Sequence, residues 1–134
     1  AIVLSPHFFL GLSQFSGCGS LASVSIPEGV TAIRNGTFAN CESLQAITIP
    51  STVQSIGNGA FGRCFNVATI ISLPSVAPTA EIGAFGSGWL AMGRTAYGSR
   101  MIYVPQGATG YDSGEWLNVL QDPAWSNYTV SYSL

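Results

Sequence analysis

The stretch FSGC, residues 15–18, decides the fold because its pattern returns twice further along the chain. It recurs as FANC at residues 38–41 and as FGRC at residues 61–64, with a step of 23 residues both times. A recurrence at fixed spacing is typical of an architecture built from stacked copies. We therefore interpret these segments as equivalent positions in successive structural repeats.

The same stretch could alternatively end a lipoprotein signal, with Cys18 as the lipidated residue. It follows an apolar opening, AIVLSPHFFLGL, as such signals do. A processing signal occurs once, however, and this opening has no basic region before its apolar run. Ser5, Pro6 and His7 also interrupt the run. We conclude that the segment belongs to the folded protein.

Aligning the copies on their cysteines reveals a shared set of positions. The set comprises Phe15/Phe38/Phe61, Leu21/Leu44/Val67, Val24/Ile47/Ile70 and Pro27/Pro50/Pro74. Alternating apolar residues such as Val24 and Ile26 predict a short strand with one face inward. The proline that follows ends the strand, because it cannot donate the next ladder hydrogen bond. Asn35 and Asn58 are placed to cap a single helical turn in each return segment.

The spacing Leu21-x-x-Val24-x-Ile26 matches the core of a leucine-rich repeat. IPSTVQSIGNGAFGRC, residues 49–64, resembles the BspA-like subclass of that repeat, which is found in bacterial cell-surface proteins. The resemblance implies an α/β solenoid, a right-handed coil with a short parallel sheet. One strand is expected per repeat of about 23 residues, with an aromatic-rich C-terminal cap. Such copies bury their apolar faces only by stacking on neighbours.

We expect one solenoid domain over residues 1–134. Residues 1–14 form a degenerate or truncated first repeat, residues 15–85 the leucine-rich repeats, and residues 86–134 the cap. All tryptophans and tyrosines lie in the last of these segments. There, the sequence predicts a strand ending at Pro105, a short helix within YDSGEWLNVLQ (residues 111–121) and a closing strand within YTVSYSL (residues 128–134).

Composition narrows the classes of partner. Only 7% of residues are charged, the net charge is −2, and all four basic residues are arginines. Nucleic acid and anionic membranes both require a dense positive surface, so neither is an expected partner. No apolar run approaches the ~18 residues that a membrane-spanning helix needs, so direct membrane insertion is not expected.

Catalytic, cofactor and metal sites are not expected. His7, the single histidine, is interpreted as a packing or surface residue, and Asp112 and Glu115 as charges near a helix N-terminus. The three evenly spaced cysteines have no C-x-x-C pair, so small buried side chains are favoured over metal or redox chemistry. No nucleophile elbow or phosphate loop is present. We predict a non-enzymatic protein without a cofactor.

The strand residues that face away from the core are the candidate contact residues for a partner. We name this set the outward strip; it consists of Ser23, Ser25, Ala46, Thr48, Thr69 and Ile71. These side chains are small and mostly uncharged, so a scaffold role is the simpler interpretation of each residue taken singly. As an alternative, exposed rings of Trp116 and Trp125 could stack on sugars, although large aromatics more often serve as a buried lid.

The resemblance implies a secreted or cell-surface module for adhesion or protein–protein contact, with a host surface or matrix protein as partner. A carbohydrate-binding module and a purely structural spacer are the alternatives. Because the chain begins with Ala1, we expect any targeting segment to lie outside residues 1–134.

Overall fold

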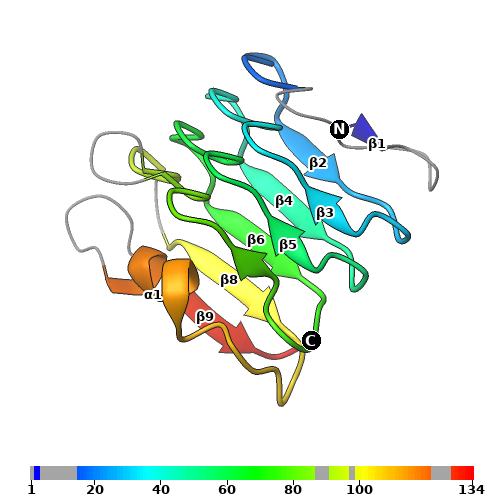
Figure 1. The fold of residues 1–134 in the computed structure, drawn as a ribbon. Coiled ribbons are helices and arrows are strands. Elements are labelled where there is room, and N and C mark those ends of the chain that lie inside the picture. Colours follow the sequence, from blue (N-terminus) through cyan, green and yellow to red (C-terminus); the bar gives the residue numbers. More distant parts are fainter. Residues whose placement is uncertain (1, 4–14, 87–90, 97–98, 122–127) are drawn as a thin grey trace.

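Two parallel β-sheets form the body of the protein (Figure 1). The computed structural model describes residues 2–3, 15–86, 91–96, 99–121 and 128–134. In the larger sheet the strand order is β1-β2-β4-β6-β8-β9, and every neighbouring pair is parallel. Its strands are β1 Ile2–Val3, β2 Ser23–Ser25, β4 Ala46–Ile49, β6 Thr69–Ser72, β8 Met101–Val104 and β9 Thr129–Tyr132. The expected strands before Pro105 and near the C-terminal end are thus confirmed.

A second sheet corrects the expectation of one strand per repeat. It has the order β3-β5-β7, and each strand follows the proline bend of its copy. The strands are β3 Ala32–Ile33, β5 Ser55–Ile56 and β7 Thr79–Ala80. The chain is extended there because it bonds to the next copy, with Gln54 N donating to Thr31 O at 2.7 Å. Ile33 and Ile56 point into the core from this side.

The segment between β3 and Cys41, which includes Asn35, consists of separate turns. The single helical turn that we expected there is therefore wrong. Hydrogen bonds inside the segment span three residues, as from Thr37 N to Arg34 O. Other donors point to the next copy, as from Phe38 N to Ala60 O at 2.9 Å. Asn35 Oδ1 accepts from the backbone N–H of Asn58, one copy further along, at 2.9 Å. The backbone of this segment therefore bonds mainly to neighbouring copies and forms no helical hydrogen-bond ladder of its own.

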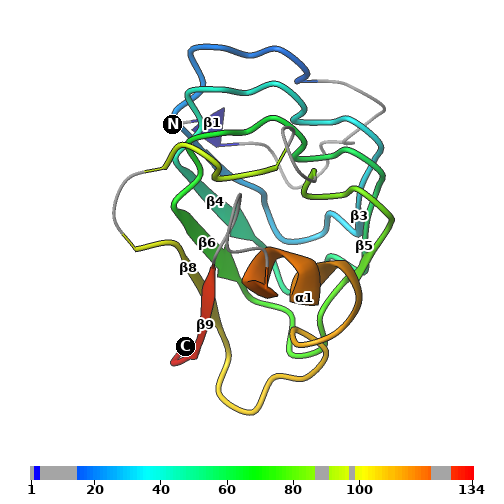
Figure 2. The ribbon, with the colours of Figure 1, turned by 90° about the vertical axis from the view of Figure 1, so that its left-hand side faces the viewer.

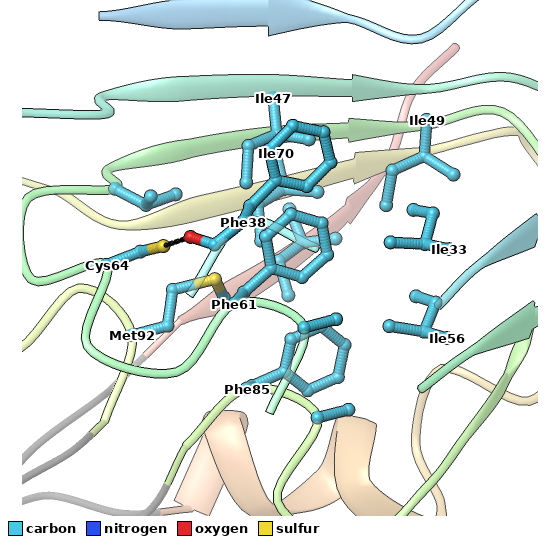
Figure 3. Packing of buried hydrophobic residues seen from close by; sticks show 14 of the residues in the cluster. Ile33, Phe38, Ile47, Ile49, Ile56, Phe61, Cys64, Ile70, Phe85 and Met92 are labelled. Atoms are coloured by element: carbon cyan, nitrogen blue, oxygen red, sulfur yellow. Dashed lines mark hydrogen bonds between the residues drawn. The ribbon is translucent and has the colours of Figure 1, made fainter. Parts of the chain in front are cut away.

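A column of phenylalanine rings runs through the core (Figure 3). The ring centroids of Phe15 and Phe38 lie 5.5 Å apart, and those of Phe38 and Phe61 also 5.5 Å, with nearly parallel planes. Phe85 continues the column at 6.2 Å from Phe61. Phe38, Phe61 and Phe85 are buried. The predicted alignment of the first three rings is confirmed.

The cysteines form a second column beside the rings. All three are free thiols, with Cys41 and Cys64 buried and Cys18 partly exposed. Cys41 Sγ donates to Phe15 O at 3.1 Å, and Cys64 Sγ donates to Phe38 O at 3.0 Å. The interpretation as small buried side chains therefore holds for Cys41 and Cys64.

Helix α1, Gly114–Gln121, confirms the helix predicted after Tyr111. Viewed along the stack, it lies between the two sheets (Figure 2). Its Trp116 ring lies 4.7 Å from Phe85 and 4.9 Å from Tyr111, measured between centroids. The column of phenylalanine rings thus ends on an aromatic cluster.

Candidate interaction surface

The outward strip lies on one face of the larger sheet, as two adjoining rows. Parallel pairing sets Ser23 opposite Ala46 and Ala46 opposite Thr69 in the first row. In the second row, the same pairing joins the remaining three residues of the strip: Ser25, Thr48 and Ile71. Because successive side chains on a strand alternate between faces, both rows point away from the core. The structure therefore brings all six residues together.

Burial separates the two faces of these strands. Val24, Ile47 and Ile70, which lie between the two outward rows along the chain, are 3%, 1% and 1% exposed. The six residues of the strip are all partly or fully exposed, and Ser25 is the most exposed of them. The strip is accessible to a partner, while the intervening residues hold the strands in place. Binding at the strip stays a prediction.

Two larger residues extend the strip, and the sequence interpretation missed them. Met101 pairs with Thr69, and Tyr103 pairs with Ile71, so each row continues onto β8. Both side chains are partly exposed. Tyrosine is a residue type that often dominates interface energies. The signal was present in MIYVP, residues 101–105, where strand alternation places Met101 and Tyr103 on one side.

The strip carries no formal charge at neutral pH. Its eight residues, counting Met101 and Tyr103, are serine, threonine, alanine, isoleucine, methionine and tyrosine. Such a surface offers hydroxyl groups and apolar atoms at the regular spacing of a parallel sheet, about 4.8 Å between neighbouring strands. It suits a partner with an uncharged, hydrogen-bonding surface of its own.

A hollow of about 380 Å³ lies over the second sheet. It is lined by Ala32, Ile33, Arg34, Asn35, Ser55, Gly57 and Glu81. Two of its polar side chains bind a neighbouring copy: the backbone N–H of Asn58 donates to Asn35 Oδ1 at 2.9 Å and to Glu81 Oε2 at 3.2 Å. Asn35 and Glu81 therefore serve the stacking of the solenoid.

The described residues contain no group of three or more His, Cys, Asp or Glu side chains that could hold a metal ion. Asp112 is exposed just before α1, and Glu115 lies in the first turn of that helix, where both charges were expected. His7 lies outside the described residues. Among the side chains that the structure describes, these groups form no catalytic constellation.

Trp116 does not offer the open ring that sugar stacking requires. It is 2% exposed, and its Nε1 donates to Pro78 O at 2.9 Å. Phe85 and Tyr111 lie against the ring, so protein atoms already occupy the surface a sugar would use. Trp125, the other candidate for glycan contact, lies outside the described residues.

Two buried tyrosines of the C-terminal segment are structural. Tyr128 Oη donates to Val67 O, and burial raises the pKa of Tyr128 above its ordinary value. Tyr111 Oη donates to Pro74 O at 2.8 Å and lies 2.9 Å from Ser72 Oγ, and burial also raises the pKa of Tyr111. Both hydroxyls remain protonated at neutral pH and bind the repeats that precede them.

None of the helices in the described part of the chain has the length and apolar character that crossing a bilayer demands.

Comparison with known proteins identifies the repeats. No curated protein and no solved structure matches the chain. A family model described as the BspA type leucine rich repeat region matches residues 9–88, in 6 copies. Leucine-rich repeats generally mediate protein–protein interaction, and the family is typically non-enzymatic. The match covers more than half of the chain and agrees with the stacked copies and parallel sheets, so the chain belongs to the BspA type leucine rich repeat family.

Proposed function

We propose that this chain is a non-enzymatic binding module of a secreted or cell-surface protein, mediating adhesion through the outward strip. The observation that carries the proposal is the continuous, uncharged outward face in which four strands contribute two aligned rows. The usual setting of the family on bacterial surfaces supports the location. The proposal includes the handedness of the solenoid, which is a right-handed coil, as the resemblance to the family implies.

The contact is centred on the β6–β8 end of the strip. Ile71 and Tyr103 are neighbours in one row, and Thr69 and Met101 are neighbours in the other. This is where the largest outward side chains gather, and large side chains supply most of the energy of an interface. The outward side chains of β2 and β4 are small, being serine, threonine and alanine. A partner can therefore approach the backbone of these two strands closely.

The partner is a protein with an uncharged, hydroxyl- or amide-rich surface, of the kind that matrix and host-surface proteins can present. The face has no charges to attract a polyanion, and the chain as a whole carries a net charge of −2. A carbohydrate partner is less favoured, because the Trp116 ring is covered by protein. A structural spacer would bind nothing through this face.

A panel of purified extracellular-matrix proteins, tested beside a glycan array, examines this function. The expected result is saturable binding to at least one matrix protein and a loss of about ten-fold or more in affinity for Tyr103→Ala. Thr79→Ala, a change on the exposed side of β7 in the second sheet, is the matched control and should retain full affinity. Binding confined to glycans, binding to neither panel, or equal effects of both substitutions would each contradict the proposal.

A further inference from the structure

The cysteine column places thiols of successive copies one ladder step apart. Backbone hydrogen bonds cross between copies beside the cysteines, from Gly17 N to Ala39 O at 2.8 Å and from Asn40 N to Gly62 O at 2.9 Å. These bonds continue the stacking of the parallel sheet, whose neighbouring strands lie about 4.8 Å apart, so the chain segments that hold the cysteines follow about the same step. Disulfides join residues whose Cα atoms are usually about 4.4–6.8 Å apart, so cysteines in neighbouring copies are close enough to be bridged.

Cys18 and Cys41 also meet at a shared acceptor. Cys41 Sγ donates to Phe15 O at 3.1 Å, and the backbone N–H of Cys18 donates to the same oxygen at 3.2 Å. Solvent reaches the three cysteines to different extents: Cys18 is partly exposed, while Cys41 and Cys64 are 0% exposed. A soluble reagent therefore meets Cys18 first, with Cys41 directly behind it.

We propose that Cys18 and Cys41 form a modification site at which a low-molecular-weight disulfide, such as oxidised glutathione, creates a bridge between two successive copies. This goes beyond the binding function and is independent of it. The bridge would join the first and second FxxC copies covalently at the N-terminal end of the phenylalanine column.

The chemistry balances in two exchange steps. The Cys18 thiolate attacks one sulfur of the oxidised glutathione, a mixed disulfide forms, and one glutathione thiolate leaves and takes up a proton. The Cys41 thiolate then attacks the Cys18 sulfur of the mixed disulfide and displaces the second glutathione, which is protonated in turn. Two protein thiols are oxidised to one disulfide, and one small disulfide is reduced to two thiols.

Geometry and access select this pair over the others. Cys18 and Cys64 are two ladder steps apart, roughly 10 Å, which exceeds the separation that a disulfide tolerates. Cys41 and Cys64 are close enough, but both are sealed from reagents. Burial and the neighbouring Cys41 raise the pKa of the Cys18 thiol, so the reaction is expected to proceed faster at mildly alkaline than at neutral pH.

Mass spectrometry of the whole chain after incubation with oxidised glutathione tests the site. The chain has no lysine, and Arg34 and Arg63 separate its three cysteines, so trypsin places each cysteine on a different peptide. The expected result is a loss of two hydrogen atoms from the intact mass and a peptide pair linked through Cys18 and Cys41. Cys64 should remain alkylatable once the protein is unfolded, and reduction should restore the starting mass.

Variants distinguish a bridge from simple capture of glutathione. Cys41→Ala should stop at the mixed disulfide, with one glutathione attached to Cys18. Cys64→Ala should still form the bridge, and Cys64→Ser serves if the alanine variant fails to fold. Cys18→Ala should react on the order of ten-fold more slowly, because access limits thiol exchange. A stable glutathione adduct on Cys18 of the unsubstituted chain, a link between Cys41 and Cys64, or no reaction at all would overturn the proposal.

Discussion

The thiol of Cys64 donates a hydrogen bond of 3.0 Å to the carbonyl oxygen of Phe38, one copy earlier (Figure 3). That oxygen already accepts the backbone N–H of Cys41 at 3.2 Å. The sulfur therefore uses the second lone pair of a buried carbonyl and ties two copies together from a side chain. The same arrangement recurs between Cys41 and Phe15. Neighbouring copies are thus joined by ring stacking, backbone bonds and thiols at once.

The phenylalanine column predicts a large and local cost of truncation. Phe38 is 0% exposed and stacks on a ring at each side, so Phe38→Ala should lower the free energy of unfolding by about 3–5 kcal/mol. Ser25→Ala, on the outward face, should change it by less than about 0.5 kcal/mol. Chemical denaturation of both variants measures the difference. Similar, small effects would show that the inward and outward faces are wrongly assigned.

The close approach of Asn35 to Gly57, which directly follows β5, leaves no space for a side chain at Gly57. A Cβ atom on Gly57 would overlap Asn35 Oδ1 and would lie 2.5 Å from Asn35 N, a backbone atom that cannot move alone. Gly57→Ala should therefore cost about 2–3 kcal/mol. Gly62→Ala is the matched control, since its nearest contact is Gly59 O at 3.4 Å. Equal stability of the two variants by denaturant titration would refute the close packing of copies at Gly57.

Arg63 predicts a stabilising substitution. It has a left-handed backbone with φ of 63°, at the position where the first copy has Gly17 with φ of 75°. An arginine in this region is strained, whereas glycine is not, so Arg63→Gly should raise the free energy of unfolding by about 0.5–1 kcal/mol. Asn40→Gly, at the same position with φ of 62°, should gain less because asparagine tolerates this conformation. A loss of stability in Arg63→Gly would contradict the assigned turn.

Tyr128 predicts a loss of stability in alkali. Burial raises its folded-state pKa above the ordinary value of 10.0, so the unfolded chain loses its proton first as pH rises. Its contribution is complete below pH 10 and declines above it, by up to about 1.36 kcal/mol per pH unit for one such group. Tyr128→Phe loses the bond to Val67 O and should be less stable at pH 8, with the gap narrowing above pH 10. A gap that stays constant from pH 8 to pH 11 would count against this assignment.

The sequence was informative where one copy dictates the position of the next. Phe15, Phe38 and Phe61 could be aligned because equal spacing places equal side chains at equal points of a stack. The short strands β3 and β5 could not be found in this way. A strand of two residues has no alternation to detect, and its extended form depends on bonds to another copy, such as Gln54 N to Thr31 O.

The candidate surface was predicted in part for the same reason. The alternation around Val24 and Ile47 fixed which residues of β2, β4 and β6 face outward. Tyr103 was missed because its strand, β8, does not follow the spacing of the repeats. The step from Ala46 to its pairing partner Thr69 is 23 residues, but the step from Thr69 to its next partner, Met101 of β8, is 32 residues. The burial of Trp116 depends on where α1 packs, which is a tertiary contact and leaves no periodic signal in the sequence.

The most direct test of the account is the affinity of a matched pair of Thr→Asp variants for a matrix protein that binds the chain. Thr48 lies in the outward strip between Ser25 and Ile71, and Thr79 lies on the exposed side of the second sheet. Surface plasmon resonance on folded samples should find Kd raised by about ten-fold or more for Thr48→Asp, because a charge is buried without a partner, and unchanged for Thr79→Asp. Unchanged binding by Thr48→Asp, or an equal loss in both, would contradict the claim that the outward strip is the binding surface.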